Sequence, residues 1–195
     1  MALQQNQTPF PVKSDRRQDL IRAAYHTIAH KGFEGLRVRE VAALVGMNGA
    51  TLHHYFPTKE LLIQAVVDSV IARLSLAFTN LSGTPAEQLH EHLTRLHRLM
   101  QEESALFVVL TEINLRAQRD PVLHFLVEQE TLWHERLVGL LQAGVEQQNW
   151  PPDLDPSTTA SAIISLVEGA SLWATIMPSR AEQALSQLEH WLHTR

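Results

Sequence analysis

The stretch VREVAALVGMNGATLHHYFPTKEL, residues 38–61, decides the fold of this chain, because two short helical patterns flank a sharp turn within it. Before the turn, apolar side chains recur at the i, i+3, i+4, i+7 spacing of a helix that buries one face. Gly46 then occupies the helix end, where the chain adopts a left-handed backbone that glycine accepts without strain. The stretch therefore opens with a short helix that stops at this glycine. Its inward positions are Val38, Val41, Ala42 and Val45.

A second short helix is predicted to follow the turn, from about residue 51. Asn48 is a favourable N-cap for it, and Leu52 and Phe56 are spaced to face inward. Its outer positions are small or polar, and small residues near a helix N-terminus let the backbone approach a phosphate or a base edge closely. A third helix starts beyond Pro57. Two short helices joined in this way form a helix-turn-helix, whose second helix enters a DNA major groove.

The segment resembles the DNA-binding domain of the tetracycline-repressor (TetR) family of bacterial regulators, which share a pattern close to V-R-[DE]-[IV]-A-x-x-[AV]-G-[VM]-[SN]-x-[GA]-T-L-Y-x-[YH]-F-x-[ST]-K-E-x-L. The resemblance covers about residues 16–62 and is specific, whereas a plain turn inside a helical bundle is the simpler alternative. It implies a regulator rather than an enzyme, with eight positions of this chain touching double-stranded operator DNA. These positions are Arg39, Asn48, Gly49, Ala50, Thr51, His53, Tyr55 and Lys59.

Three features depart from the family pattern. The Leu-Arg pair at 36–37 replaces the Ser/Thr pair that caps the second helix, which predicts a weaker cap there. His53 stands where a tyrosine commonly grips a phosphate, and its ring can donate the same bond more weakly. Gly49 offers no side chain where many relatives read a base. Sequence specificity is therefore expected to rest on Arg39, Thr51 and DNA shape.

Charge is distributed unevenly along the chain. The whole sequence carries a net charge of −5, although phosphate contacts come mainly from Lys and Arg. Residues 1–60 contain eight Lys or Arg against five Asp or Glu, a net +3 that leaves −8 for the remainder. A basic head on an acidic body suits a protein that presents one end to DNA and is repelled elsewhere. Chance asymmetry is the simpler alternative.

Composition indicates a cytoplasmic protein without a membrane partner. The chain has 195 residues, 45% of them hydrophobic, which is enough to bury a core. It has no cysteine for disulfides, thiolate metal sites or redox sensing. Its first dozen residues are polar and rich in Gln and Pro, unlike a signal peptide. We also expect no apolar run that reaches the roughly 20 residues needed to cross a bilayer.

Turn and cap residues divide the rest of the chain into an all-α succession of helices. We predict a disordered tail over 1–13, a helix-turn-helix DNA-binding domain of three helices over 14–58, and six helices for effector binding and dimerisation over 59–195. Nine helices are also what the family resemblance implies. The first is predicted to run from about 15 to 30, and those of the body over about 59–81, 85–103, 105–118, 121–148 and 156–176, with Ser179 capping the last.

The last two helices are predicted to form a homodimer interface. Their apolar surface is broad enough to need a partner, and two copies would bury it as a four-helix bundle around a two-fold axis. The same axis would present two reading heads to DNA, which predicts a near-palindromic operator. Packing of these helices on their own body is the alternative. The predicted interface residues are Ile163, Val167, Ala170, Ala174, Leu185, Leu188 and Leu192.

The body is also where the resemblance implies an effector cavity. A mostly apolar pocket with a few polar groups would bind a small, moderately hydrophobic molecule, although each candidate is also explained as plain core. Binding would shift the body to a shape that tilts the helix starting at Lys59 and spreads the two heads. The candidate cavity residues are Met100, Phe107, Asn114, Trp133, Arg136, Trp173 and Met177.

Eleven histidines raise a metal alternative, which the spacing does not favour. Glu87 and His90 have the Glu-x-x-His spacing of di-iron bundles, but such a centre needs two of these motifs and only one is found. His190 and His193 are explained as a solvated chain end. No phosphate loop or nucleophile elbow is present, so no cofactor or metal is expected. The predicted function is a ligand-responsive DNA-binding regulator, with repression the family's commoner mode; an interaction protein that has lost DNA binding and a helical enzyme are the alternatives.

Overall fold

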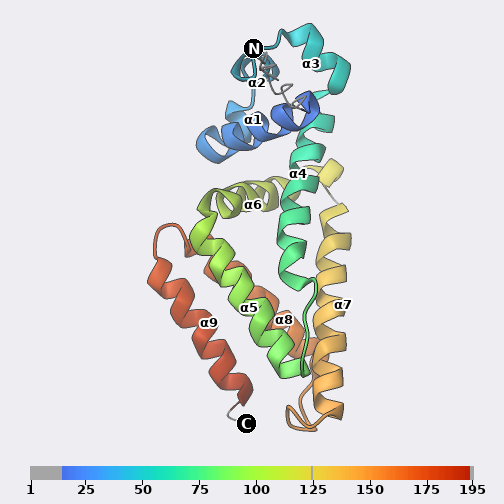
Figure 1. Ribbon diagram of the computed structural model, residues 1–195, viewed down its shortest axis with the longest axis vertical. Helices are drawn as coiled ribbons and strands as arrows, with labels where there is room; N and C mark the ends of the chain where they lie inside the picture. The colour runs from blue at the N-terminus through green and yellow to red at the C-terminus, as the bar shows by residue number, and fades with distance from the viewer. Residues whose placement is uncertain (1–14, 124, 194–195) are drawn as a thin grey trace, which may run out of the picture.

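The computed structural model describes residues 15–123 and 125–193, and every regular element in these ranges is helical, as predicted (Figure 1). A small head of three helices stands at one end of an elongated molecule, and α4 descends from it into a longer body. Three short 3-10 turns lie at 33–35, 76–78 and 121–123. The α-helices are α1 (Arg16–Lys31), α2 (Val38–Leu44), α3 (Gly49–Tyr55), α4 (Lys59–Ser75), α5 (Pro85–Glu102), α6 (Ser104–Ala117), α7 (Phe125–Glu146), α8 (Pro156–Trp173) and α9 (Pro178–His193).

Local signals set the helices of the head where the sequence predicts them. The Asp15 side chain caps α1 by accepting the Arg17 backbone N–H at 3.1 Å, and α1 ends at Gly32. Gly46 has a φ of 68°, the left-handed backbone expected at the end of α2. Buried apolar side chains hold the three helices together, and they are continuous with the core of the body. The fully buried ones in the head include Leu20, Ala24, Ile28, Val41, Ala42 and Leu52. The predicted tail over 1–13 lies outside the described residues.

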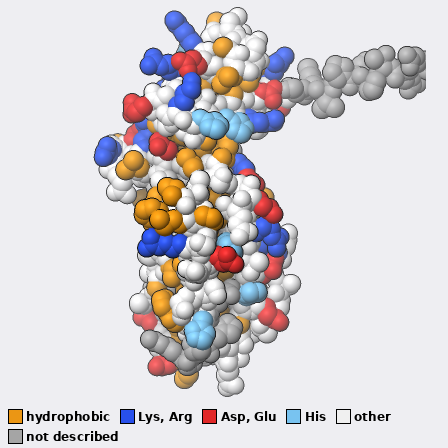
Figure 2. All heavy atoms as spheres, turned by 90° about the vertical axis from the view of Figure 1, so that its left-hand side faces the viewer, with side chains coloured by type: hydrophobic (Ala, Val, Ile, Leu, Met, Phe, Trp, Pro, Cys, Tyr) orange, Lys and Arg blue, Asp and Glu red, His pale blue; other side chains and the backbone are white. Residues whose placement is uncertain are grey.

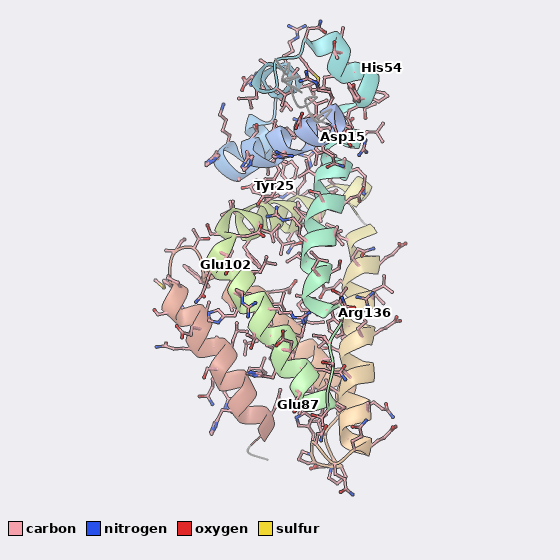
Figure 3. All side chains as sticks on the ribbon, in the orientation of Figure 1. Asp15, Tyr25, His54, Glu87, Glu102 and Arg136 are labelled. Carbon is pink, nitrogen blue, oxygen red and sulfur yellow. The ribbon has the colours of Figure 1, made fainter. Side chains whose placement is uncertain are left out.

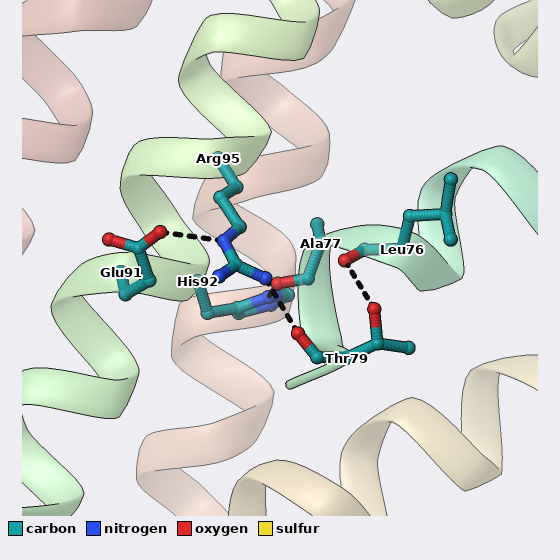
Figure 4. Close-up of polar contacts among 6 residues, drawn as sticks. All are labelled: Leu76, Ala77, Thr79, Glu91, His92 and Arg95. Carbon is teal, nitrogen blue, oxygen red and sulfur yellow. Dashed lines mark hydrogen bonds and ion pairs between the residues drawn. The ribbon is translucent and has the colours of Figure 1, made fainter. Parts of the chain in front are cut away.

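The helix α4 ends at Ser75, earlier than the predicted end near residue 81. Two side chains of α5 bind the backbone carbonyls that follow this end (Figure 4). The His92 Nδ1–H donates to the Ala77 carbonyl at 3.0 Å, and Arg95 donates to the Thr79 carbonyl at 2.6 Å. Because these partners come from another helix, the chain after Ser75 satisfies its carbonyls without continuing α4.

Residues 59–78 correct one expectation from the sequence. This segment, α4 with its 3-10 extension, is long and apolar enough by length and composition to cross a membrane, which we did not expect of any segment. In this structure its apolar side chains instead pack between head and body. The buried ones are Leu62, Ile63, Ala65, Val66, Val67 and Val70.

Three other helix ends differ from the prediction. The helix expected from residue 121 begins at Phe125, because the backbone before it closes a 3-10 bond from the Leu123 N–H to the Asp120 carbonyl at 3.0 Å. The helix α8 ends at Trp173 rather than near 176. The last helix begins at Pro178, so Ser179 lies inside its first turn and is not its cap.

Head and body meet where α6 crosses directly beneath α1 (Figure 1). The Glu112 carboxylate of α6 accepts the Phe33 backbone N–H at 3.3 Å, and the Arg116 guanidinium lies 5.1 Å from the Phe33 ring centroid. Arg73 of α4 pairs with Glu103 and lies 5.2 Å from the ring centroid of Tyr25, which Figure 3 labels at the lower edge of the head. The head therefore rests on both α4 and α6.

Candidate nucleic-acid interface and ligand cavity

The helix α3 is anchored by one buried core residue and presents its outer face to solvent. Leu52 is fully buried, whereas Ala50, His53 and Tyr55 are exposed around it. His54 lies at the outer edge of the head (Figure 3). A helix held by one side and open on the other has the form required to enter a DNA groove.

Asn48 is the N-cap of α3, as the sequence predicts, and its side chain binds Thr51. The Asn48 side-chain oxygen accepts the Thr51 backbone N–H at 2.8 Å and the Thr51 hydroxyl at 3.0 Å. Since that hydroxyl proton is already donated within the protein, the Thr51 oxygen is left as an acceptor toward solvent. Its methyl group is available for apolar contact. The cap thus fixes what Thr51 exposes on the outer face: an acceptor oxygen and a methyl group.

Arg39, in the first turn of α2, lies beside Gly49 at the start of α3. Arg39 is exposed, and its Cγ lies 3.8 Å from where a Cβ on Gly49 would stand. That is an ordinary van der Waals separation, and Gly49 does not have a positive φ. The fold of the head therefore does not itself require a glycine at this position.

The other predicted DNA-contacting residues surround the second turn. The His53 ring nitrogen Nδ1 lies 3.3 Å from the Pro57 carbonyl oxygen, which orients the exposed imidazole. Lys59 begins α4, whose N-cap Thr58 accepts the Leu61 N–H at 3.2 Å. All eight predicted positions thus gather around α3 and its two flanking turns, and none is fully buried.

The N-terminus of α2 lacks the side-chain cap, as predicted from the departure at 36–37. Arg37 is the N-cap residue and makes no capping bond with its side chain. Leu36 is 1% exposed and belongs to the head core instead. The pair therefore contributes apolar burial where a Ser/Thr pair would contribute hydrogen bonds.

A cavity of about 210 Å³ lies in the body, between helices α4 to α8. Four of the seven predicted cavity residues line it, namely Phe107, Asn114, Trp133 and Arg136. The other three do not. Met100 is 2% exposed and packed in the core, while Trp173 and Met177 are 38% and 44% exposed outside the cavity. Apolar helical spacing alone did not separate a cavity wall from core or surface. The apolar wall also includes Ile71, Leu74, Phe78, Leu96, Leu110 and Val167.

His92 closes one side of this cavity and was missed from the sequence. It is 2% exposed, and its Nε2 accepts the Trp133 indole N–H at 3.2 Å while Nδ1 donates to Ala77. Burial lowers the pKa of His92 to about 4, so the ring is neutral near pH 7 with its proton on Nδ1. The Phe78 ring packs on it, with centroids 4.4 Å apart. His92 therefore connects the cavity wall to the end of α4.

Two acidic residues of the cavity were also missed. Glu130 on α7 and Glu168 on α8 both line it with part of their side chains and are otherwise exposed to solvent. Burial, together with the charge of Glu168, raises the pKa of Glu130, and burial raises the pKa of Glu168. The available signal was spacing: Glu130 precedes the predicted Trp133 by three residues and so lies on the same helical face.

The predicted dimer residues need correction. Six of the seven are at most 8% exposed, because the inner faces of α8 and α9 pack on each other and on α5 and α7. Only Leu192 is partly exposed. A partner copy would therefore meet a different set of side chains, and apolar groups gather at mid-height on the face bearing α9 (Figure 2). The exposed large apolar residues of these two helices and their connection are Leu172, Trp173, Ile176, Met177 and Trp191.

The metal alternative finds no support among the described residues. Glu87 is used in the capping box of α5, where its carboxylate accepts the Thr84 backbone N–H at 2.8 Å. Within the described part of the chain, no group of three or more His, Asp or Glu is arranged to hold a metal ion. The side chain of His193, one of the second candidate pair, lies outside the described residues.

Comparisons with known proteins match both parts of the chain. Residues 20–66 match the family of bacterial regulatory proteins named tetR, and residues 85–195 match the C-terminal family of BetI-type transcriptional repressors. The HTH-type transcriptional repressor KstR2 of Mycolicibacterium smegmatis is 26% identical over 73% of this chain and 71% of its own length. The HTH-type transcriptional regulator BetI of Rhizobium meliloti is 32% identical over 38% of each chain.

A solved structure shares the fold over nearly the full length. The TetR transcription regulator from Haloarcula marismortui superposes with a TM-score of 0.82 at 21% identity, covering 92% of this chain and 97% of its own. At that level of identity the likeness concerns the fold alone.

Proposed function

Because this chain belongs to the TetR family of bacterial DNA-binding regulators, which are not enzymes, we propose that it is a transcriptional repressor released from its operator by a small, moderately hydrophobic effector. The observation that carries the proposal is the head's open α3 together with a cavity walled by the helices on which the head rests. We place its action in the cytoplasm, where the operator DNA is.

The head would read DNA through α3, with phosphates contacted from both flanking turns. Thr51 and Arg39 are the candidates for base contacts, because both are exposed at the start of α3. Lys59 and His53 are the candidates for phosphates. The remaining interface positions would let the backbone of α3 come close to the DNA and complete the contact surface. These are Asn48, Gly49, Ala50 and Tyr55.

The cavity would communicate with the head through two routes. The helix α6 carries Phe107 and Asn114 in the cavity wall and Glu112 against the head. The end of α4 is tied to the cavity wall through His92, which bonds both Ala77 and Trp133. A ligand that favours one arrangement of α4 and α6 would bias the orientation of the head, and operator affinity would change by the same coupling free energy.

A homodimer is part of the proposal. The exposed large apolar side chains of α8, α9 and their connection, among them Trp173, Ile176 and Trp191, supply the face that a second copy would cover. Ile176 is 71% exposed and its neighbour Met177 is 44% exposed, so the connection between α8 and α9 contributes exposed apolar surface to this face. A two-fold axis through this face would pair the two heads on a near-palindromic operator.

The test is fluorescence anisotropy with duplexes from the intergenic DNA upstream of the gene. The wild type should bind one duplex far more tightly than random DNA of equal length, and Arg39→Ala should remove most of this difference. Arg98→Ala is the matched control, because Arg98 is an exposed arginine of α5, in the body. Equal binding of specific and random DNA by the wild type would overturn the proposal.

A further inference from the structure

Two neighbouring arginines at the start of α1 touch the two turns that flank α3. The Arg16 Nη1 lies 3.5 Å from the carbonyl oxygen of Val45, in the turn that precedes α3. The Arg17 guanidinium carbon lies 5.0 Å from the ring centroid of Phe56, the C-cap residue at the other end of α3. Figure 3 shows Asp15, the residue before this pair, below α3 at the end of α1. The start of α1 therefore contacts both ends of α3.

Local contacts hold the second arginine in place. The Asp15 carboxylate is used as the cap of α1, where it accepts the Arg17 backbone N–H at 3.1 Å. Phe56 is 2% exposed, so the ring beneath the Arg17 guanidinium is fixed by the core of the head. A planar guanidinium that stacks on a ring keeps its N–H donors available at its edge. Arg17 is therefore held in position without using up its hydrogen-bond donors on a protein acceptor.

The fold does not account for two cations at this end of α1. Arg16 and Arg17 occupy the first turn, where the unpaired backbone N–H groups carry partial positive charge and disfavour a cation. Both side chains are exposed, and in the described part of the chain no carboxylate forms an ion pair with either. Farther along the same helix, Arg22 does lie 3.9 Å from the Asp19 carboxylate. An anion outside the protein would balance the charge at the start of α1.

We propose that Arg16 and Arg17 bind phosphates of operator DNA at the two ends of α3, in addition to the candidates Lys59 and His53. A helix that enters the major groove lies between two phosphate backbones, so cations beside its ends come close to them. Guanidinium groups suit this role, because their planar set of donors matches the oxygens of a phosphate. The inference rests on the proposed function, since α3 must enter the groove before these phosphates come within reach.

The test is the salt dependence of DNA binding by the full-length protein. Fluorescence anisotropy gives the affinity for the operator duplex and for a random duplex over a range of salt concentrations. Arg16→Gln and Arg17→Gln should each flatten the slope of log affinity against log salt concentration by about 0.9, and weaken both duplexes alike, by roughly eightfold at about 0.1 M salt. Arg17→Lys keeps the charge and should keep the slope of the wild type.

Arg22→Gln is the matched control, because it removes the same charge from an exposed position of the same helix, where Asp19 already engages it. It should leave the slope unchanged. Slopes in Arg16→Gln and Arg17→Gln no flatter than in this control would overturn the inference. An affinity loss confined to the operator would also overturn it, since both residues would then only position α3.

The same titrations separate the two proposals. Operator binding by the wild type with unchanged slopes in both variants would overturn only this inference. Equal binding of operator and random duplex by the wild type, with flatter slopes in both variants, would overturn only the proposed function.

Discussion

The two candidate sites of this protein are assembled in opposite ways. The candidate DNA-facing surface of the head comes from one stretch of chain, between Arg39 and Lys59, and local caps and turns set its geometry. The cavity of the body is walled by five helices, with side chains as distant in sequence as Ile71 and Ser171. The first site is therefore formed by local chemistry, whereas the second exists only once the whole body has packed.

The largest expected effect tests whether head and body are separable. Leu52→Ala should lower the free energy of unfolding of the head by about 2–5 kcal/mol, because the side chain is fully buried between α3 and the head core. Hydrogen exchange should then show lost protection in α1 to α3 with α7 and α8 still protected. Leu61→Ala is the control, since Leu61 is 50% exposed and should change little. An equal loss of protection in every helix would show that the two regions unfold as one unit.

The second prediction concerns the group by which α3 reads DNA. If the Thr51 oxygen accepts a hydrogen bond from a base, Thr51→Val should weaken specific binding by about 1–3 kcal/mol, and Thr51→Ser should retain most of the affinity. The valine keeps the methyl group and the serine keeps the oxygen, so the two variants separate these roles. Anisotropy with the specific and a random duplex measures both. The reverse order would assign the contact to the methyl group, and no loss in either variant would remove Thr51 from the interface.

What the sequence predicts follows the same division. The turn at Gly46, the Asn48 cap and the missing side-chain cap at Arg37 were all predicted correctly, because each depends on residues within one turn of it. The end of α4 was not predicted correctly, because the backbone carbonyls that follow it accept hydrogen bonds from His92 and Arg95 of another helix. No local pattern contains that information.

The residues assigned to the dimer face show a second limit. The helix α8 is apolar on more than one side, so its spacing does not distinguish the face packed in its own body from a face offered to a partner. The residues predicted for the dimer, including Ile163 and Val167, lie on the inner face. Glu130 and Glu168 were not predicted for the cavity, because an acidic residue on an exposed helix turn is usually solvated.

The third prediction tests the contact between the two regions. Glu112→Ala should cost about 1 kcal/mol in unfolding free energy and speed exchange of the Phe33 amide, because it removes the carboxylate that accepts this N–H at 3.3 Å. Glu112→Gln should restore much of the loss, since the amide oxygen still accepts. Glu102→Ala, an exposed carboxylate at the end of α5, is the control. Equal losses for alanine and glutamine would mean that the negative charge, rather than the acceptor oxygen, is what the head requires.

The fourth prediction is the pH dependence that the cavity imposes on the body. Burial, with the charge of Glu168 added, raises the pKa of Glu130 above 4.5, and burial raises that of Glu168. The native state therefore binds more protons than the unfolded chain just above that pH, and stability from this pair falls as pH rises through the range. Glu130→Gln/Glu168→Gln should raise the melting temperature at neutral pH by about 1–2 °C, a small effect because solvent screens both groups.

Melting curves from about pH 4.5 to neutrality measure this effect, with Glu135→Gln as the control, because Glu135 is an exposed carboxylate of α7 that does not line the cavity. The melting temperature of the double variant should decline less with rising pH than that of the wild type. A double variant less stable than the wild type at neutral pH would show that the two carboxylates are satisfied in the folded body, contrary to the charge distribution of the cavity.

The smallest expected effect concerns Gly49 in the head, a position where the fold itself does not require a glycine. A Cβ at Gly49 would lie 3.8 Å from Arg39 Cγ, and the position does not have a positive φ, so Gly49→Ala should change unfolding free energy by less than about 0.5 kcal/mol. If the glycine serves the close approach of α3 to DNA, operator affinity should fall while urea unfolding stays the same. Gly46→Ala is the contrasting variant, because a φ of 68° makes it destabilising whatever the DNA does. Unchanged operator affinity in Gly49→Ala would mean that DNA stays farther from the start of α3 than the exposed surface allows, and base reading would then depend on the side chains of Arg39 and Thr51 alone.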